Sequence, residues 1–151
     1  AAMFAHALDA VTRWLARELL RGGEGVTKVI DIEVRGAADQ AQARAAARAI
    51  STSILLKAAV HGGDPNWGRA IVALGNSGAE FDPSALDLWI GATQVVAGGS
   101  PTEYAEPTVA AHFQGPDCRI AADLHAGPAS SEAWGCDLSK EYVEINSAYM
   151  T

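Results

Sequence analysis

A chain of 151 residues is long enough to bury a hydrophobic core and fits a single domain over residues 1–151. Its net charge of −7, with scattered lysines and arginines, argues against a nucleic-acid partner. No apolar run approaches the roughly 20 residues that span a bilayer, so we expect a soluble, cytoplasmic protein without a membrane partner.

The first predicted element is an amphipathic helix. Apolar residues recur there at three- and four-residue spacing until Gly22-Gly23 ends the pattern. The pattern begins almost at Ala1 and has no N-cap residue before it. We therefore expect that a segment preceding Ala1 is missing. The apolar positions of this helix are Phe4, Ala7, Leu8, Val11, Trp14, Leu15 and Leu19.

A strand and a second helix come next. Apolar residues alternate with charged ones over residues 30–35, which predicts a half-buried strand. Asp39 can cap a helix that runs to about Ser51. The run 54–60 is short and apolar, which favours a buried strand or an extended segment. The inner stripe of the second helix is expected to be Ala43, Ala46, Ala47 and Ile50.

The remaining elements mix helix and strand. Asp64-Pro65 predicts a helix start, with Gly75 as its end. Residues 86–90 and 93–97 predict a hairpin, and 98–107 a loop. We expect further strands at 119–124 and 133–136, then a short helix from Ser139. This order favours an α+β fold rather than a regular doubly wound sheet.

Generic catalytic and metal-binding motifs are absent from the sequence. There is no GxSxG, P-loop, HExxH or GxGxxG. The four histidines lack ligand spacing, so no metal site is expected. Cys118 and Cys136 form no CxxC, and two cysteines in an acidic chain without a signal peptide are typical of free thiols rather than a disulfide.

Three stretches nevertheless concentrate polar and glycine residues: 22–28, 61–69 and 142–151. Each has a purely structural interpretation. The first is explained by a helix-to-strand turn with an exposed Glu24, the second by a capped helix start with a packed Trp67, and the third by a frayed chain end.

Together, the stretches closely resemble one family. The blocks Glu24-Gly25-Val26-Thr27-Lys28 and Asp64-Pro65-Asn66-Trp67-Gly68-Arg69, about 40 residues apart, are similar to the C-terminal portion of the ornithine acetyltransferases, also called glutamate N-acetyltransferases. The resemblance runs from about residue 5 to the end. Its other blocks are Ser53-Ile54-Leu55-Leu56-Lys57-Ala58-Ala59, Asp137-Leu138-Ser139, Tyr142-Val143 and Asn146-Ser147-Ala148-Tyr149.

The resemblance implies a layered α+β fold and covalent catalysis. Enzymes of this family cleave their own precursor before a threonine, which becomes the N-terminal nucleophile of the second, beta chain. Acetyl passes from N-acetylornithine to that threonine and then to glutamate, with no metal or organic cofactor. The resemblance also implies an alpha chain as partner and an alpha2-beta2 assembly in the cytoplasm.

The sequence departs from the family at the nucleophile. A mature beta chain would begin with threonine, whereas this chain begins Ala1-Ala2-Met3. The resemblance implies that the nucleophile lies in a missing N-terminal part of the beta chain, so we expect no catalytic residue here and no activity from this chain alone. Ala58 also stands where the family commonly has threonine.

Three family positions for substrate binding remain. By resemblance, the carboxylate of Glu24 receives the side-chain ammonium of N-acetylornithine. The amide of Asn146 suits a carboxylate or an acyl amide. Thr151 offers a hydroxyl beside the terminal carboxylate. We expect Lys57, Asp64, Trp67 and Arg69 to shape the fold instead, Asp64 as a helix cap.

Two alternative functions stay open on sequence alone. A related amidase or aminopeptidase with an N-terminal threonine would pass the acyl group to water rather than to glutamate. A non-catalytic interaction domain derived from the enzyme would need no nucleophile. A piece without its partner strands is also expected to expose an apolar edge.

Overall fold

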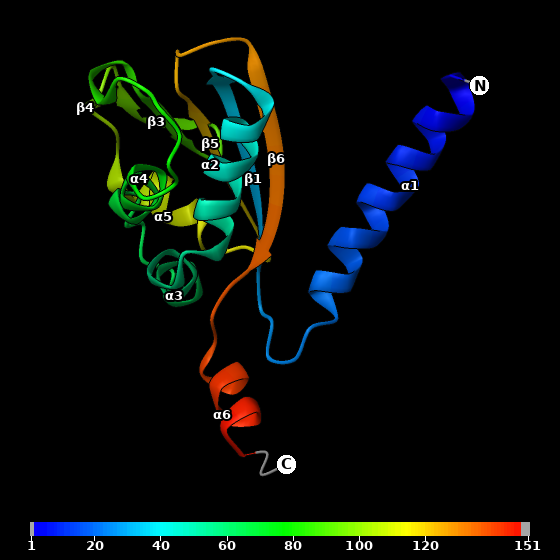
Figure 1. Cartoon of the computed structure of the whole chain (residues 1–151). Coiled ribbons are helices and arrows are strands. Elements are labelled where there is room, and N and C mark those ends of the chain that lie inside the picture. The colour runs from blue at the N-terminus through cyan, green and yellow to red at the C-terminus, as the bar shows by residue number, and fades with distance from the viewer. Residues whose placement is uncertain (1, 149–151) are drawn as a thin grey trace.

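The computed structural model describes residues 2–148, and in this range six strands form one mixed sheet (Figure 1). The sheet order is β4-β3-β2-β5-β1-β6. Strands β1 and β5 are parallel, and the other neighbouring pairs are antiparallel. The strands are β1 (Val29–Ala37), β2 (Asp87–Ile90), β3 (Thr93–Ala97), β4 (Ser100–Pro101), β5 (Asp117–Asp123) and β6 (Ala129–Cys136).

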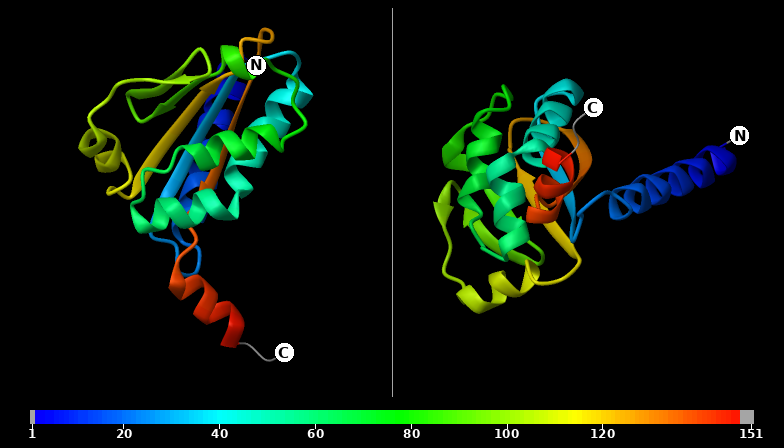
Figure 2. Two further views of the ribbon diagram at one scale, coloured as in Figure 1. Left: turned by 90° about the vertical axis from the view of Figure 1, so that its left-hand side faces the viewer. Right: turned by 90° about the horizontal axis from the view of Figure 1, so that it is seen from below.

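Helices lie on both sides of this sheet, which confirms the predicted layered α+β class. Helices α2 and α4 cover one face, whereas α1 extends away on the opposite side, and α6 projects beyond one end (Figures 1 and 2). The helices are α1 (Ala2–Arg21), α2 (Gln40–Thr52), α3 (Ile54–Gly62), α4 (Gly68–Gly75), α5 (Glu106–His112) and α6 (Lys140–Ala148), with a 3-10 turn over Pro83–Ala85.

The core lies between the sheet and the helices on one of its faces, and it includes the packing of α2 on β1 that the sequence predicts. The alternating apolar side chains of β1 are buried. The side chain of Asp39 caps α2 by accepting the N–H groups of Ala41 and Gln42. Small residues on the inner face of α2 let the helix pack closely on β1 and β6. All four predicted members of that stripe are buried: Ala43, Ala46, Ala47 and Ile50.

Helix α1 is held to the open face of the sheet by arginines. Nη2 of Arg17 lies 2.7 Å from Oδ2 of Asp31, and Arg13 pairs with Glu132. An exposed ion pair such as Arg13–Glu132 contributes only about 0–1 kcal/mol. The apolar side chains of α1 remain largely exposed, so the expected apolar surface lies on this helix rather than on a strand edge. They are Met3, Phe4, Leu8, Val11, Trp14, Leu15 and Leu19.

The prediction of a strand or extended segment over residues 54–60 is wrong, because this run forms helix α3. The hydroxyl of Ser53 caps the helix by accepting the N–H of Leu56 at 3.4 Å. Ile54 and Leu55 are 69% and 61% exposed. Because these two exposed residues are apolar like the buried ones, the sequence shows a continuous apolar run instead of the spacing that is typical of a helix.

The predicted helix start at Asp64-Pro65 is also wrong. Helix α4 begins at Gly68, and its N-cap residue, Trp67, makes no side-chain cap hydrogen bond. A tight turn, in which the N–H of Trp67 bonds to the carbonyl of Pro65, delays the helix. Asp64 therefore does not act as a cap, and its Oδ2 lies 3.7 Å from Nη2 of Arg69.

The later elements mostly follow the prediction. The hairpin of β2 and β3, the strands β5 and β6, and the helix after Ser139 are all present. The region 98–107, predicted as a loop, contains β4 and the first two residues of α5. Both cysteines are free thiols, as predicted.

None of the helices between residues 2 and 148 has the length and hydrophobicity that a bilayer span requires.

Candidate functional site

The side chain of Asp137 joins three segments that are far apart in the sequence. Its Oδ1 accepts the backbone N–H groups of Thr27 and Lys28, each at 2.9 Å. Its Oδ2 accepts the hydroxyl of Thr27 at 2.6 Å and lies 2.7 Å from Nδ1 of His61. A carboxylate offers about four acceptor positions, so the hydrogen-bonding capacity of Asp137 is filled.

These contacts define the ionisation of Asp137 and the tautomer of His61. The Asp137 side chain is fully buried. Burial alone would raise its pKa, but hydrogen bonds from Thr27, Lys28 and His61 outweigh this effect and hold the pKa of Asp137 below its ordinary value. Because an ionised carboxylate only accepts, Nδ1 of His61 must carry the proton.

Thr27, Lys28, His61 and Asp137 form a hydrogen-bonded junction, and the ammonium of Lys28 extends this junction to the ends of two helices. Nζ donates to the carbonyl of Val60 at 2.8 Å and also to the carbonyl of Phe113. These carbonyls lie at the C-terminal ends of α3 and α5, where a positive charge complements the helix dipole. Lys28 thus fixes the start of β1 against both helices.

Gly25 brings the loop before β1 against the first turn of α6. Its φ of +66° is in the left-handed region, and an added Cβ would lie 2.9 Å from Oγ of Ser139 and would overlap the backbone nitrogen of Tyr142. Ser139 itself caps α6, because its hydroxyl accepts the N–H of Tyr142 at 2.9 Å. Glycine is needed here for both conformation and space.

Of the three predicted substrate-binding residues, two lie close to this junction. Glu24 is exposed in the turn next to Gly25, and its carboxylate has no hydrogen bond or ion pair with residues 2–148. Asn146 is exposed on α6 one turn beyond Tyr142, and its amide donates to the Tyr142 carbonyl at 2.8 Å. The structure brings these two segments together without a direct contact between the two side chains. Thr151 lies outside the described residues.

Residues of the other family-like blocks connect the elements around the junction. The N–H of Leu138 donates to the carbonyl of Lys57 at 3.2 Å. Arg69 donates from Nη1 to the carbonyl of Leu55 at 2.6 Å, which holds the start of α4 to α3. Trp67 packs on the core and donates from its indole nitrogen to the hydroxyl of Tyr104 at 2.6 Å. These contacts agree with the expectation that residues of this kind shape the fold.

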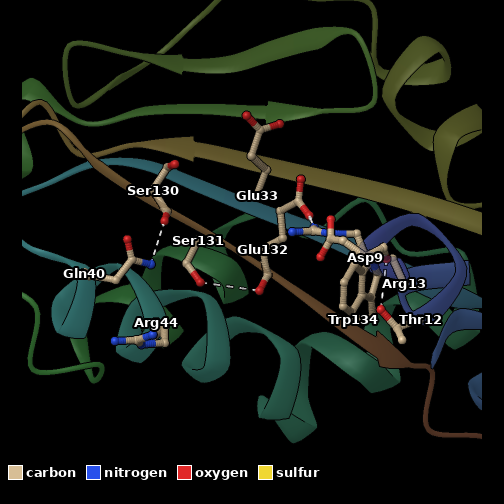
Figure 3. Close-up of a pocket in the computed structure, with 10 residues that line it drawn as sticks. All are labelled: Asp9, Thr12, Arg13, Glu33, Gln40, Arg44, Ser130, Ser131, Glu132 and Trp134. Carbon is tan, nitrogen blue, oxygen red and sulfur yellow. Dashed lines mark hydrogen bonds and ion pairs between the residues drawn. The ribbon is translucent and has the colours of Figure 1, made fainter. Parts of the chain in front are cut away.

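A separate hollow of about 540 Å³ lies between α1, α2 and β6 (Figure 3). One of its two arginines is already paired, because Arg13 forms ion pairs with both Asp9 and Glu132. No residue of the family-like blocks lines it. The junction at Asp137 is therefore the better candidate site. The hollow is lined by Asp9, Thr12, Arg13, Glu33, Gln40, Arg44, Ser130, Ser131, Glu132 and Trp134.

The sequence alone predicts no functional role for Asp137, His61 or Lys28, although Lys28 and His61 stand in two of the polar stretches and Asp137 in a family-like block. The available sequence signal for this contact is that Asp137 and Thr27 belong to two blocks of one family. Because 110 residues separate them, the sequence alone does not show that their side chains form a hydrogen bond. Among residues 2–148 there is no group of three His, Cys, Asp or Glu side chains that could hold a metal ion.

Comparison with known proteins agrees with this pattern of blocks. The model of the ArgJ family matches residues 1–151. The chain is 50% identical to the arginine biosynthesis bifunctional protein ArgJ of Symbiobacterium thermophilum over 148 residues, which are 98% of this chain and 37% of that protein. It is 44% identical over 150 residues to the protein of the same name from Listeria monocytogenes, covering 99% of this chain and 38% of that protein.

A solved structure has the same fold. The crystal structure of the arginine biosynthesis bifunctional protein ArgJ of Bacillus halodurans superposes with a TM-score of 0.93 at 40% identity, over 98% of this chain and 70% of that chain. The chain spans 37% and 38% of the length of the two curated relatives above. The family model matches the whole chain and the solved structure has the same fold, so the chain belongs to the ArgJ family.

Proposed function

We propose that this chain is the substrate-holding portion of an acetyltransferase of arginine biosynthesis. The complete enzyme moves acetyl from N-acetylornithine to glutamate through a threonine acyl-enzyme, and that threonine is not in this chain. Membership of a family whose relatives are named for arginine biosynthesis supports this proposal. In this proposal residues 1–151 are a single domain or part of one, the C-terminal portion of the beta chain.

The proposed reaction has two acyl transfers. The threonine hydroxyl attacks the acetyl carbonyl of N-acetylornithine, the amide C–N bond breaks, and ornithine leaves with the proton. The amine of glutamate then attacks the acyl-enzyme ester, which releases the threonine and forms N-acetylglutamate. Both steps balance without a metal or an organic cofactor.

The observation that carries the proposal is the attachment of the Glu24 turn to the start of α6. Glu24 is a carboxylate with no partner among the described residues, so it is available to a substrate ammonium. The contact of Gly25 with the first turn of α6 supports a shared role for Glu24 and Asn146 at one end of the substrate. Thr151 completes the proposed substrate-binding set.

The proposal includes partners for the exposed surface of the chain. An alpha chain and the N-terminal part of the beta chain complete the enzyme, as two copies of each chain. The exposed apolar side chains of α1 support a neighbour that covers this helix, because apolar patches of this kind mark interaction surfaces.

Substitution of Glu24 tests the proposal in the complete enzyme. Glu24→Gln removes the charge but keeps the shape, so KM for N-acetylornithine is expected to rise roughly ten- to hundredfold through loss of a charge-assisted hydrogen bond. Glu103→Gln is the matched control, because Glu103 is exposed and lies outside the junction. An unchanged KM in the Glu24 variant contradicts the assignment.

Product analysis separates transfer from hydrolysis. Complete enzyme supplied with N-acetylornithine and glutamate is expected to yield N-acetylglutamate. Free acetate without N-acetylglutamate would identify a hydrolase instead, since water would then be the acyl acceptor.

A further inference from the structure

We infer that Asp137 is a positioning residue for the Glu24 turn, and this inference rests on the proposed function. Its carboxylate sets the turn against the start of α6, so that the carboxylate of Glu24 is held where the substrate ammonium binds. The turn in question is residues 24–28, which contains no helix or strand of its own.

The first observation is that the turn is attached to residues 137–142 at several points. The carboxylate of Asp137 holds both N–H groups at the end of the turn, and the N–H of Asp137 donates to the carbonyl of Lys28 at 3.1 Å. Two residues from the Thr27 bonds, Gly25 lies against Tyr142. The turn is therefore attached near its start and at its end to the segment 137–142, which leads into α6.

The second observation is that every hydrogen-bonding position of the Asp137 carboxylate is occupied. Asp137 is buried, ionised and accepts four hydrogen bonds, from two N–H groups, one hydroxyl and the imidazole of His61. Loss of one partner leaves a buried donor or acceptor unpaired, which is costly. The structure therefore favours a single position of the turn, as a preorganised binding site requires.

The third observation is that Glu24 has no other restraint. Its side chain makes no hydrogen bond or ion pair with residues 2–148, so its position depends on the backbone of the turn. Misplacement of a binding group by about 1 Å can cost up to a hundredfold in rate. Asp137 can thus affect substrate binding without touching the substrate.

The test is a double-mutant cycle in the complete enzyme. Asp137→Ala is expected to raise KM for N-acetylornithine about tenfold. In a Glu24→Gln background, the same substitution is expected to have less than a twofold effect, because the group that Asp137 positions no longer carries charge. Equal effects of Asp137→Ala in both backgrounds would overturn the inference.

Two conservative variants guard against loss of the fold. Asp137→Asn keeps an oxygen that can accept both N–H groups, so it is expected to recover most of the affinity lost in the alanine variant. Thr27→Val removes a single hydroxyl at nearly constant volume and is expected to raise KM two- to threefold. No change in KM for either the alanine or the valine variant would overturn the inference.

An uncharged analogue separates positioning from general damage. N-acetylnorvaline has the same chain length as N-acetylornithine but lacks the ammonium, so its competitive inhibition constant is expected to stay within twofold in all Asp137 variants. If the Asp137 variants weakened the binding of N-acetylnorvaline and N-acetylornithine by the same factor, the inference would be overturned. If Glu24→Gln itself leaves KM unchanged, the proposed function fails; if only the Asp137 variants leave KM unchanged, the positioning role alone fails.

Discussion

Gly25 lies directly against the backbone of Tyr142, with a left-handed φ of +66° that a side chain would strain. This contact joins the turn before β1 to the helix that ends the described chain, two segments separated by more than 110 residues. A substrate held by both segments would therefore depend on one glycine.

Gly25→Ala is expected to destabilise the protein by more than about 1–2 kcal/mol, the usual cost of left-handed backbone at a residue with a side chain, because the new methyl group also meets backbone atoms. Urea unfolding measures the change. The control is Gly62→Ala, where an added Cβ meets nothing within 4 Å. Equal stability of the two variants would contradict the packing described for Gly25.

Lys28→Met is expected to cost roughly 2–3 kcal/mol of unfolding free energy, because carbonyls at the ends of α3 and α5 lose a charged donor. Chemical denaturation checks the value. Lys140→Met serves as control, since Lys140 is exposed and makes no hydrogen bond or ion pair within the described range. A loss below about 0.5 kcal/mol for Lys28→Met would show that water replaces the ammonium easily.

Ionisation of Asp137 is expected to make the unfolding free energy of the protein decrease as the pH falls into the acidic range. Its folded-state pKa lies below the unfolded value of about 4, since its hydrogen bonds outweigh the burial that opposes ionisation. The ionised group therefore stabilises the fold above the unfolded pKa, and this contribution is lost as the pH falls through the folded pKa.

The corresponding measurement compares wild type with Asp137→Asn between pH 7 and pH 3. We expect the stability advantage of the wild type to shrink as the pH falls, while other acidic residues contribute equally to both proteins. An advantage that stays constant with pH would mean that Asp137 is not ionised in the folded protein.

His125 gives the opposite sign of pH dependence. It has a φ of +49°, and its Nε2 lies 2.8 Å from Oδ2 of Asp87. The hydrogen bond to Asp87 is the largest effect that raises the pKa of His125, with Asp123 adding to it. The resulting stability is present below the unfolded pKa of about 6.5 and is lost as the pH rises through the folded pKa.

His125→Asn tests this contribution, because asparagine tolerates left-handed backbone but does not titrate. Thermal unfolding from pH 5.5 to pH 8.5 is expected to show a loss of stability with rising pH that is greater in wild type than in the variant. Identical slopes would exclude His125 as the titrating group.

The sequence predicts elements whose signals are local. Asp39 caps α2 with its own side chain, and the alternation in β1 marks its buried face, so both are visible in a few residues. The prediction for the α3 segment is wrong because Ile54 and Leu55 are apolar yet exposed. The sequence does not predict helix α5, because its seven residues, beginning Glu106-Pro107, show little helical periodicity.

The candidate site could be predicted only in part. Glu24 and Asn146 follow from the resemblance of short blocks, which needs no knowledge of the fold. The role of Asp137 depends on pairing between the start of β1 and the end of β6, and such long-range register cannot be obtained from local pattern. Tertiary structure was required to show that one carboxylate joins these blocks.

The most direct test of the account is a crystal structure of the complete enzyme with bound ornithine. We expect the side-chain ammonium of ornithine within about 3 Å of a carboxylate oxygen of Glu24, at the distance of a charge-assisted hydrogen bond. An ammonium bound instead in the hollow beside Glu33 and Glu132, or at any carboxylate outside the 24–28 turn, would contradict the assignment of this junction as the substrate site.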